Sequence, residues 1–226
     1  MVNLNPLKKN PRYLSFLSML AVVLWVMCLV SQDRLISVHL GYICAAVLPY
    51  PFLCITFDMI AELYGYRESR RTLWSSLILV YIFVLGIYLF TKLPAPSFWE
   101  IRTETFNAAM SPLLRILIFN SIAFITGQYI NIYIFSKLRL MLKGRFFGLR
   151  SIGSTFIGDT ITFAVSLFGD FSGLMTNHSI LVLVIAELII MYLMAIVLAF
   201  PASVIVSLLK KTEPDYNTGV TFNPFK

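Results

Sequence analysis

Three carboxylates lie within or beside strongly apolar stretches of the sequence. Asp58 and Glu62 follow the run PYPFLCITF, and Asp159 follows STFIG. A charged side chain at bilayer depth costs about 3 kcal/mol or more to insert, so it needs a partner or a ligand. Ionisable residues at such positions mark the pathway of a substrate or an ion. These three residues are therefore candidate ligand-binding groups.

Amide side chains lie at a similar depth. Gln128 and Asn131 share one helical stripe in the fourth apolar segment, and Asp159 shares another with Ser and Thr residues. Asp58, Gln128 and Asp159 each lie nine residues from a basic residue near a segment end. Nine residues of helix span about 14 Å, which is close to the middle of a bilayer. The spacing predicts one polar layer inside the membrane.

Structural roles are an alternative for part of this set. Gln128 and Asn131 can instead bond across helices. Asp58 and Glu62 can pair with the basic cluster that follows them as a structural network. That cluster consists of Arg67, Arg70 and Arg71. Asp159 has no basic residue within two helical turns, so a structural ion pair explains it least.

The elements that must position these residues are transmembrane helices. Of the 226 residues, 58% are hydrophobic and 13% are charged, and the mean hydropathy of +0.82 excludes an ordinary soluble protein. Long apolar runs without alternation exclude a β-barrel. We predict an all-α membrane protein with one polytopic domain, residues 1–226. Its six predicted spans are Leu14–Ser31, Leu35–Phe57, Leu73–Phe90, Leu113–Phe135, Ile152–Phe168 and Ile180–Leu209.

The distribution of basic residues predicts the orientation. The N-terminal tail, the loops after the second and fourth spans, and the C-terminal tail contain 14 of the 18 Lys and Arg residues. Cytoplasmic segments hold an excess of these residues, so both termini are expected inside. The formal charge of +7 then fits basic loops against an anionic leaflet and requires no nucleic-acid partner.

The segment KLPAPSFWEIRTETFNAAMSP, between the third and fourth spans, is too polar to cross a bilayer. Ser97 and Glu100 form a capping-box pattern at the start of a short helix. Aromatic residues such as Trp99 indicate an amphipathic helix on the outer surface. We favour an anchoring role for this helix over that of a gating lid.

Helix breakers and small residues occur close to the candidate carboxylates. Pro49 and Pro51 in the second span, and Pro201 in the sixth, remove backbone donors, as breaks at transporter substrate sites do. Gly153 and Gly158 in the fifth span are typical of close helix packing. The polar residues of the second, fourth and fifth spans are expected to share one level.

The sequence predicts no cofactor and no metal site. Its three cysteines have no C-x-x-C spacing and no neighbouring histidine. It contains no G-x-x-x-x-G-K-[ST] motif, so the chain has no predicted ATP-hydrolysing domain of its own.

Three segments, FDMIAELYGYRESRR, RILIFNSIAFITGQYINIYIFSKLR and IGDTITFAVSLFG, occur in order between about residues 49 and 201. Together they resemble the signature regions of the queuosine-precursor transporters, bacterial inner-membrane proteins formerly labelled putative vitamin uptake transporters. The resemblance implies import of 7-cyano- or 7-aminomethyl-7-deazaguanine. It implies substrate-binding roles for the matching residues, which are Asp58, Glu62, Arg115, Gln128 and Asp159.

Two positions depart from the family pattern. Many members have Asp where this chain has Asn131, which we keep among the candidate site residues, and Lys where it has Met191. A guanine-like base offers two parallel N–H donors, which one carboxylate such as Asp159 or Asp58 can accept. Gln128 can pair with the carbonyl edge of the base. An aromatic ring from Phe57, Phe124 or Phe163 can stack on it.

Three classes of function remain open on these residues. The first is a stand-alone transporter of a small deazapurine. The second is a substrate-binding membrane subunit of an ATP-driven uptake system. The third is an intramembrane aspartyl protease with two carboxylates sharing a proton, which is disfavoured because the motif places glycine where this chain has Phe156. The prediction is a transporter and not an enzyme, with the bilayer as its surroundings and a homo-oligomer left open.

Overall fold

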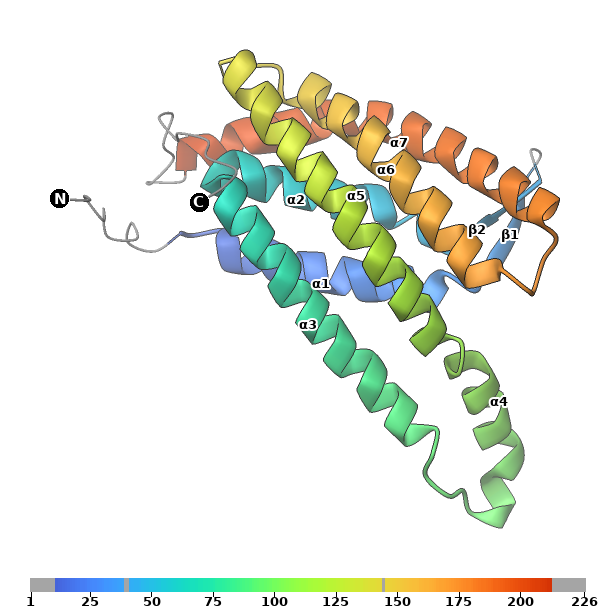
Figure 1. Ribbon diagram of the computed structural model, residues 1–226. Coiled ribbons are helices and arrows are strands. Elements are labelled where there is room, and N and C mark those ends of the chain that lie inside the picture. Colours follow the sequence, from blue (N-terminus) through green and yellow to red (C-terminus); the bar gives the residue numbers. More distant parts are fainter. Residues whose placement is uncertain (1–10, 39–40, 144, 213–226) are drawn as a thin grey trace.

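The computed structural model describes residues 11–38, 41–143 and 145–212, and within these residues the chain is a helical bundle with one small hairpin (Figure 1). The α-helices are α1 (Leu14–Ser31), α2 (Tyr50–Tyr64), α3 (Tyr66–Phe90), α4 (Glu100–Met110), α5 (Leu113–Met141), α6 (Phe147–Phe171) and α7 (Asn177–Thr212). The start of α1 and the end of α7 lie at one end of the bundle. The hairpin lies at the other end.

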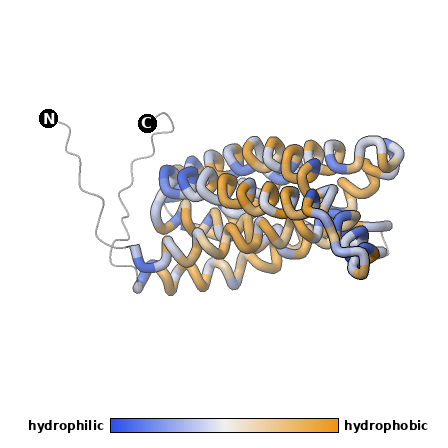
Figure 2. Tube along the Cα trace, turned by 90° about the horizontal axis from the view of Figure 1, so that it is seen from below, coloured by the Kyte–Doolittle hydropathy of each residue, from blue (hydrophilic) through white to orange (hydrophobic). Residues whose placement is uncertain are grey.

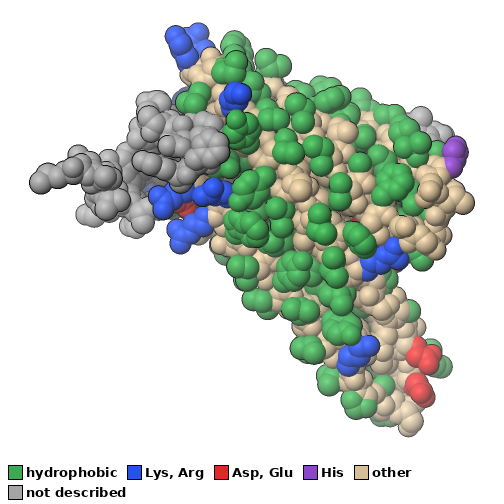
Figure 3. Space-filling view, viewed as in Figure 1, with side chains coloured by type: hydrophobic (Ala, Val, Ile, Leu, Met, Phe, Trp, Pro, Cys, Tyr) green, Lys and Arg blue, Asp and Glu red, His purple; other side chains and the backbone are tan. Residues whose placement is uncertain are grey.

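Within the described part of the chain, six helical stretches are long and apolar enough to cross a membrane. Hydrophobic residues follow the length of the bundle and hydrophilic residues gather near its ends (Figure 2). Many hydrophobic side chains lie along the visible long face, and Lys and Arg cluster at the end where α1 begins (Figure 3). The chain is therefore a multi-pass membrane protein, as predicted.

The first part of the predicted second span is not helical. Strands β1 (Leu35–Val38) and β2 (Gly41–Cys44) pair antiparallel, and a short 3-10 helix, Ala45–Val47, follows them. The prediction of one helix over Leu35–Phe57 is therefore wrong. The stretch is rich in Ile, Val and Tyr, which are as compatible with a strand as with an apolar helix. Gly41, at φ 127°, adopts a backbone conformation that suits glycine.

The prolines of PYPF begin a helix and do not interrupt one. Pro49 is the N-cap residue of α2 and Pro51 lies in its first turn, where a missing backbone donor costs nothing. At the other end of α2, Gly65 has φ 89° and separates α2 from α3 by a single residue. Helix α7 continues through Pro201.

Helix α2 is the most enclosed of the spans. In the span Ala45–Tyr64, 78% of the residues in its most apolar window are buried inside the protein, compared with 28–44% in the other five described spans. Helices α5 and α6 form the most extensive helix pair, and α2 also contacts α5, α6 and α7. Side chains of α2 therefore face protein where most other spans face lipid.

The short helix between the third and fourth spans exists, but its predicted capping box is wrong. A 3-10 turn covers Ser97–Trp99, and α4 then begins at Glu100 with no side-chain cap. The turn and α4 contain no buried residue. Together with the second half of α3, they project from the rest of the bundle (Figure 1).

Candidate substrate site in the bundle interior

A buried polar layer crosses the middle of the bundle. We define the central polar layer as Tyr50, Cys54 and Asp58 of α2, Gln128 and Asn131 of α5, and Ser151 and Asp159 of α6. All seven side chains are buried, and both carboxylates and both amides have no exposed surface at all. The structure thus brings together the polar residues that their spacing placed at one level.

Helix spacing explains how α2 supplies its share of the layer. Tyr50, Cys54 and Asp58 follow one another at intervals of four residues, so they lie on one face of the helix. Glu62 continues the same stripe by one further turn. Tyr50 and Cys54 were missed as site residues by the sequence reasoning, although this interval of four was visible in the sequence.

On one side of the layer, Asp58 accepts hydrogen bonds from two helices. Ser151 Oγ of α6 donates to Asp58 Oδ2, and Asn131 Nδ2 of α5 donates to Asp58 Oδ1 at 3.5 Å. Asn131 Nδ2 also lies 3.4 Å from Gln128 Oε1. The Oδ1 atom of Asn131 is buried without a hydrogen-bond partner in the described structure. Asp58 is therefore largely satisfied by the protein, while Asn131 keeps an unused acceptor.

On the other side, Asp159 is satisfied at only one oxygen. Its Oδ1 accepts from Tyr50 OH at 3.0 Å and lies 3.8 Å from Cys54 Sγ, which Gln128 Nε2 approaches to 3.3 Å. Its Oδ2 is buried and has no hydrogen-bond partner among the described residues. Buried polar groups are normally paired, so this oxygen is an acceptor available to a donor that the described residues do not supply.

Two glycines let α5 and α6 approach closely at this level. A Cβ atom added at Gly127 would lie 2.7 Å from the carbonyl oxygen of Gly158, and one added at Gly158 would lie 2.8 Å from that of Gly127. The prediction of close packing is confirmed for Gly158. At Gly153 an added Cβ atom would meet only Leu138 Cδ1 at 3.9 Å, so no close approach requires that glycine. The residues that follow these two glycines, Gln128 and Asp159, lie in the central polar layer.

Aromatic rings lie next to the layer. Tyr50, which binds Asp159, packs edge-on against Phe163 with ring centroids 5.1 Å apart. Phe124, one turn before Gln128, lies 4.1 Å from the buried ring of Trp25 and 5.8 Å from that of Phe57. The three rings considered for stacking are therefore near the layer, each already in contact with another aromatic residue.

Glu62 belongs to a separate ionic cluster towards the end of α2. Its carboxylate lies 2.9 Å from Arg150 Nη1, 2.5 Å from Lys210 Nζ and 3.5 Å from Arg139 Nε. Glu62 and Arg150 are fully buried. In the described residues Glu62 has no ion pair with the basic cluster at the start of α3, so the alternative that paired Glu62 there is wrong. The acidic residue instead joins α2 to α5, α6 and α7.

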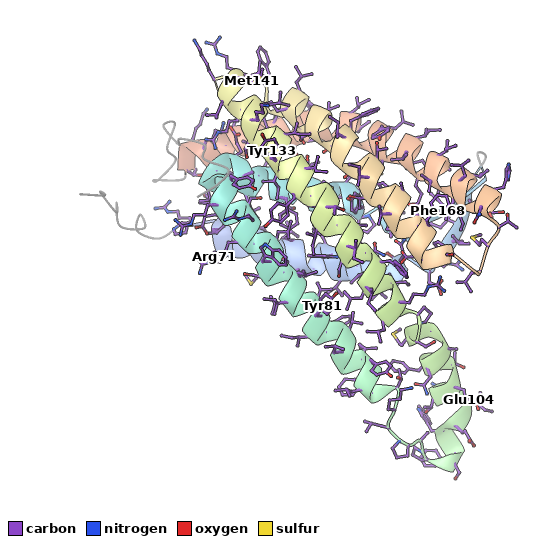
Figure 4. The ribbon with its side chains drawn as sticks, viewed as in Figure 1. Arg71, Tyr81, Glu104, Tyr133, Met141 and Phe168 are labelled. Atoms are coloured by element: carbon purple, nitrogen blue, oxygen red, sulfur yellow. The ribbon has the colours of Figure 1, made fainter. Side chains whose placement is uncertain are left out.

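This ionic cluster lies at one end of the bundle. Figure 4 places Arg71 of α3 and Met141 of α5 at that end, and Phe168 of α6 and Glu104 of α4 towards the other. The sequence reasoning missed Arg150 and Lys210 as partners of Glu62. They are 88 and 148 residues away from it in the chain, so no local pattern connects them.

Arg115 lies far from the central polar layer. It precedes Gln128 by 13 residues on α5, which corresponds to about 20 Å of helix. Its guanidinium donates to the carbonyl oxygens of Gly169, at 3.0 Å, and Ser172. Of the six residues singled out from the sequence, four therefore meet in the layer, Glu62 lies one turn away, and Arg115 fixes the end of α6.

Within the described ranges, no group of three or more His, Cys, Asp or Glu side chains has the arrangement of a metal site. The polar groups of the layer are two carboxylates, two amides, a phenol, a hydroxyl and a thiol, and two of their acceptor oxygens have no hydrogen-bond partner among the described residues. Such a set can recognise a neutral or cationic molecule that presents N–H donors.

Comparisons with known proteins agree with this description. Residues 44–206 match a family model described as "Putative vitamin uptake transporter". A protein of Bacillus subtilis (strain 168) named "Probable queuosine precursor transporter" is 29% identical over 126 residues. That match covers 53% of this chain and 53% of the relative, so it spans about half the length of each. No solved structure matches the chain.

Proposed function

Since this chain belongs to the putative vitamin uptake transporter family, we propose that it carries a queuosine precursor across a bacterial inner membrane into the cytoplasm. The family consists of transporters, so the chain is a transporter and not an enzyme. The proposed substrates are 7-cyano- and 7-aminomethyl-7-deazaguanine. Residues 1–226 would form one membrane domain with both termini inside and α4 as an amphipathic helix on the outer surface.

The observation that carries this proposal is the unpartnered Oδ2 atom of Asp159. A deazaguanine presents a ring N–H and an exocyclic amine side by side, and a carboxylate accepts both. Tyr50 holds Oδ1 at 3.0 Å, which fixes the orientation of the carboxylate. Gln128 and the unused acceptor of Asn131 can recognise further polar atoms of the base. We assign Asp159, Asp58, Gln128 and Asn131 to the substrate site.

The ionic cluster around Glu62 supports a direction for the path. It lies one turn beyond Asp58, at the end of the bundle where basic residues gather, and that end would face the cytoplasm. Four helices meet at Glu62, so the cluster would close the path between the central polar layer and the cytoplasm. Release of the substrate would require these ion pairs to separate, and Glu62 would therefore act on transport without touching the substrate.

The test is the substitution Asp159→Asn, measured as uptake of labelled deazaguanine by cells that cannot synthesise it. Asn keeps the volume but replaces one acceptor with a donor, which faces the donors of the substrate. The loss of a buried charged partner costs about 2–5 kcal/mol, so uptake should fall by roughly 30-fold or more. Gln128→Ala removes neutral bonds of about 1 kcal/mol each and should reduce uptake by about fivefold.

The matched control is Asp33→Asn, which makes the same chemical change at an exposed position. It should transport like the wild type. Wild-type uptake by Asp159→Asn, at an equal amount of protein in the membrane, would remove Asp159 from the site. Uptake into liposomes by the purified protein alone would separate a stand-alone transporter from a subunit that needs an ATPase partner.

A further inference from the structure

A second carboxylate of α6, Asp170, repeats the pattern of Asp159. Its Oδ2 accepts from Asn120 Nδ2 at 2.7 Å and from Gln32 Nε2 at 3.2 Å. Its Oδ1 is buried and has no hydrogen-bond partner in the part of the chain that the structure describes. The side chain is only 4% exposed. Asp170 thus also offers one acceptor oxygen that the described residues leave unused.

The carboxylate of Asp170 is held from two elements, the end of α1 and helix α5. Gln32 directly follows the end of α1 and Asn120 lies on α5, so amides from two parts of the chain bind one oxygen of Asp170 and fix the orientation of the carboxylate. The other oxygen keeps no hydrogen-bond partner among the described residues. Arg115 holds the same end of α6 through the carbonyl oxygens of Gly169 and Ser172. A buried carboxylate oxygen without a partner is costly, so its place in the structure needs an explanation, and the binding of a donor supplies one.

Asp159 and Asp170 lie on the same side of α6. They are 11 residues apart, which is about three helical turns and 16 Å along the axis. Thr162 and Ser166 lie between them on the same stripe, and both are buried. The two carboxylates therefore lie in one row on α6, with Thr162, Ser166 and the buried ring of Phe163 between them.

We propose that Asp170, Asn120 and Gln32 form an outer subsite, which binds the paired N–H donors of the substrate before it reaches Asp159. The ligand class is a planar heterocycle with two adjacent N–H groups, because each carboxylate leaves one oxygen for such an edge beside carboxamides. This inference rests on the proposed function. It adds a binding step at the end of the bundle opposite the Glu62 cluster.

The experiment measures initial rates of uptake of labelled 7-cyano- and 7-aminomethyl-7-deazaguanine against substrate concentration. Asp170→Asn should raise KM for uptake about tenfold and leave the maximal rate within twofold of wild type. Equilibrium binding of the same bases to the purified protein should change by less than twofold, because the central polar layer is intact. A purely structural role of Asp170 would instead lower the maximal rate and the binding capacity together.

The matched control is Glu187→Gln, which neutralises another buried carboxylate. One oxygen of Glu187 already accepts from the backbone N–H of Cys44 at 2.7 Å, and neither oxygen is a buried acceptor without a partner. Glu187→Gln should keep the wild-type KM. An equal rise in KM for both variants, or an unchanged KM for Asp170→Asn, would overturn the subsite.

A second variant tests the outer subsite if Asp170→Asn does not accumulate in the membrane. Gln32→Ala removes one amide of the subsite but keeps the bond between Asp170 and Asn120, and it should raise KM about threefold. An unchanged KM would again overturn the proposal. Failure of the proposed function looks different, because the wild type would then take up neither base, or Asp159→Asn would transport normally.

Discussion

The contact between Gly127 and Gly158 should be intolerant of a single methyl group. In Gly127→Ala the new Cβ atom would lie 1.8 Å from Thr162 Oγ1 and 2.7 Å from the carbonyl oxygen of Gly158. Rotation of Thr162 can relieve the first clash but not the second, because the second partner is backbone. Helices α5 and α6 must therefore separate by about 0.7 Å or more to reach ordinary contact near 3.4 Å.

Overpacking of this kind costs about 1–3 kcal/mol. For a chain of this length that corresponds to a fall in Tm of roughly 2–12 °C. Gly127→Ala should also weaken binding of the substrate, because the same shift moves Gln128 away from Asp159. The measurements are thermal unfolding of the purified protein in detergent and ligand binding at a temperature where the variant is folded.

Gly86→Ala on α3 is the matched control. An added Cβ atom at Gly86 would meet nothing within 4 Å, so this variant should keep the wild-type Tm or slightly exceed it. If Gly127→Ala unfolds at the same temperature as Gly86→Ala and binds substrate equally well, the close approach of α5 and α6 does not set the geometry of the central polar layer.

Two further predictions concern the ionic cluster and the orientation. Glu62→Gln leaves three cations without their shared carboxylate and should destabilise the protein by about 3–5 kcal/mol, whereas Glu68→Gln, in a surface pair at 3.9 Å, should cost less than about 1 kcal/mol. Equal unfolding temperatures for the two variants would contradict this. In a cysteine-free background, a cysteine at Ser97 should react with an impermeant reagent in intact cells, and cysteines at Arg70 or Arg145 should not. Labelling at Arg145 would reverse the proposed orientation.

Hydropathy and helical periodicity were enough to predict the membrane class and most of the helices. A transmembrane helix needs about 20 apolar residues in a row, and that requirement is local, so hydropathy found α1 with its exact bounds, Leu14–Ser31. Helical periodicity likewise placed Gln128, Asn131 and Asp159 on polar stripes. Hydropathy failed at β1 and β2, because it measures burial from water and does not distinguish an apolar strand from an apolar helix.

How the polar groups pair depends on contacts between helices that are distant in the sequence. Glu62 could have met the nearby arginines of α3, but it meets Arg150 and Lys210, far along the chain. Asp58 and Asp159 are both buried carboxylates, yet of these two Asp159 alone keeps an oxygen without a hydrogen-bond partner in the described part of the chain. Which acceptor oxygen has no partner depends on side chains from several helices and on how closely those helices approach one another. The periodicity of a single helix contains no information about these contacts between helices.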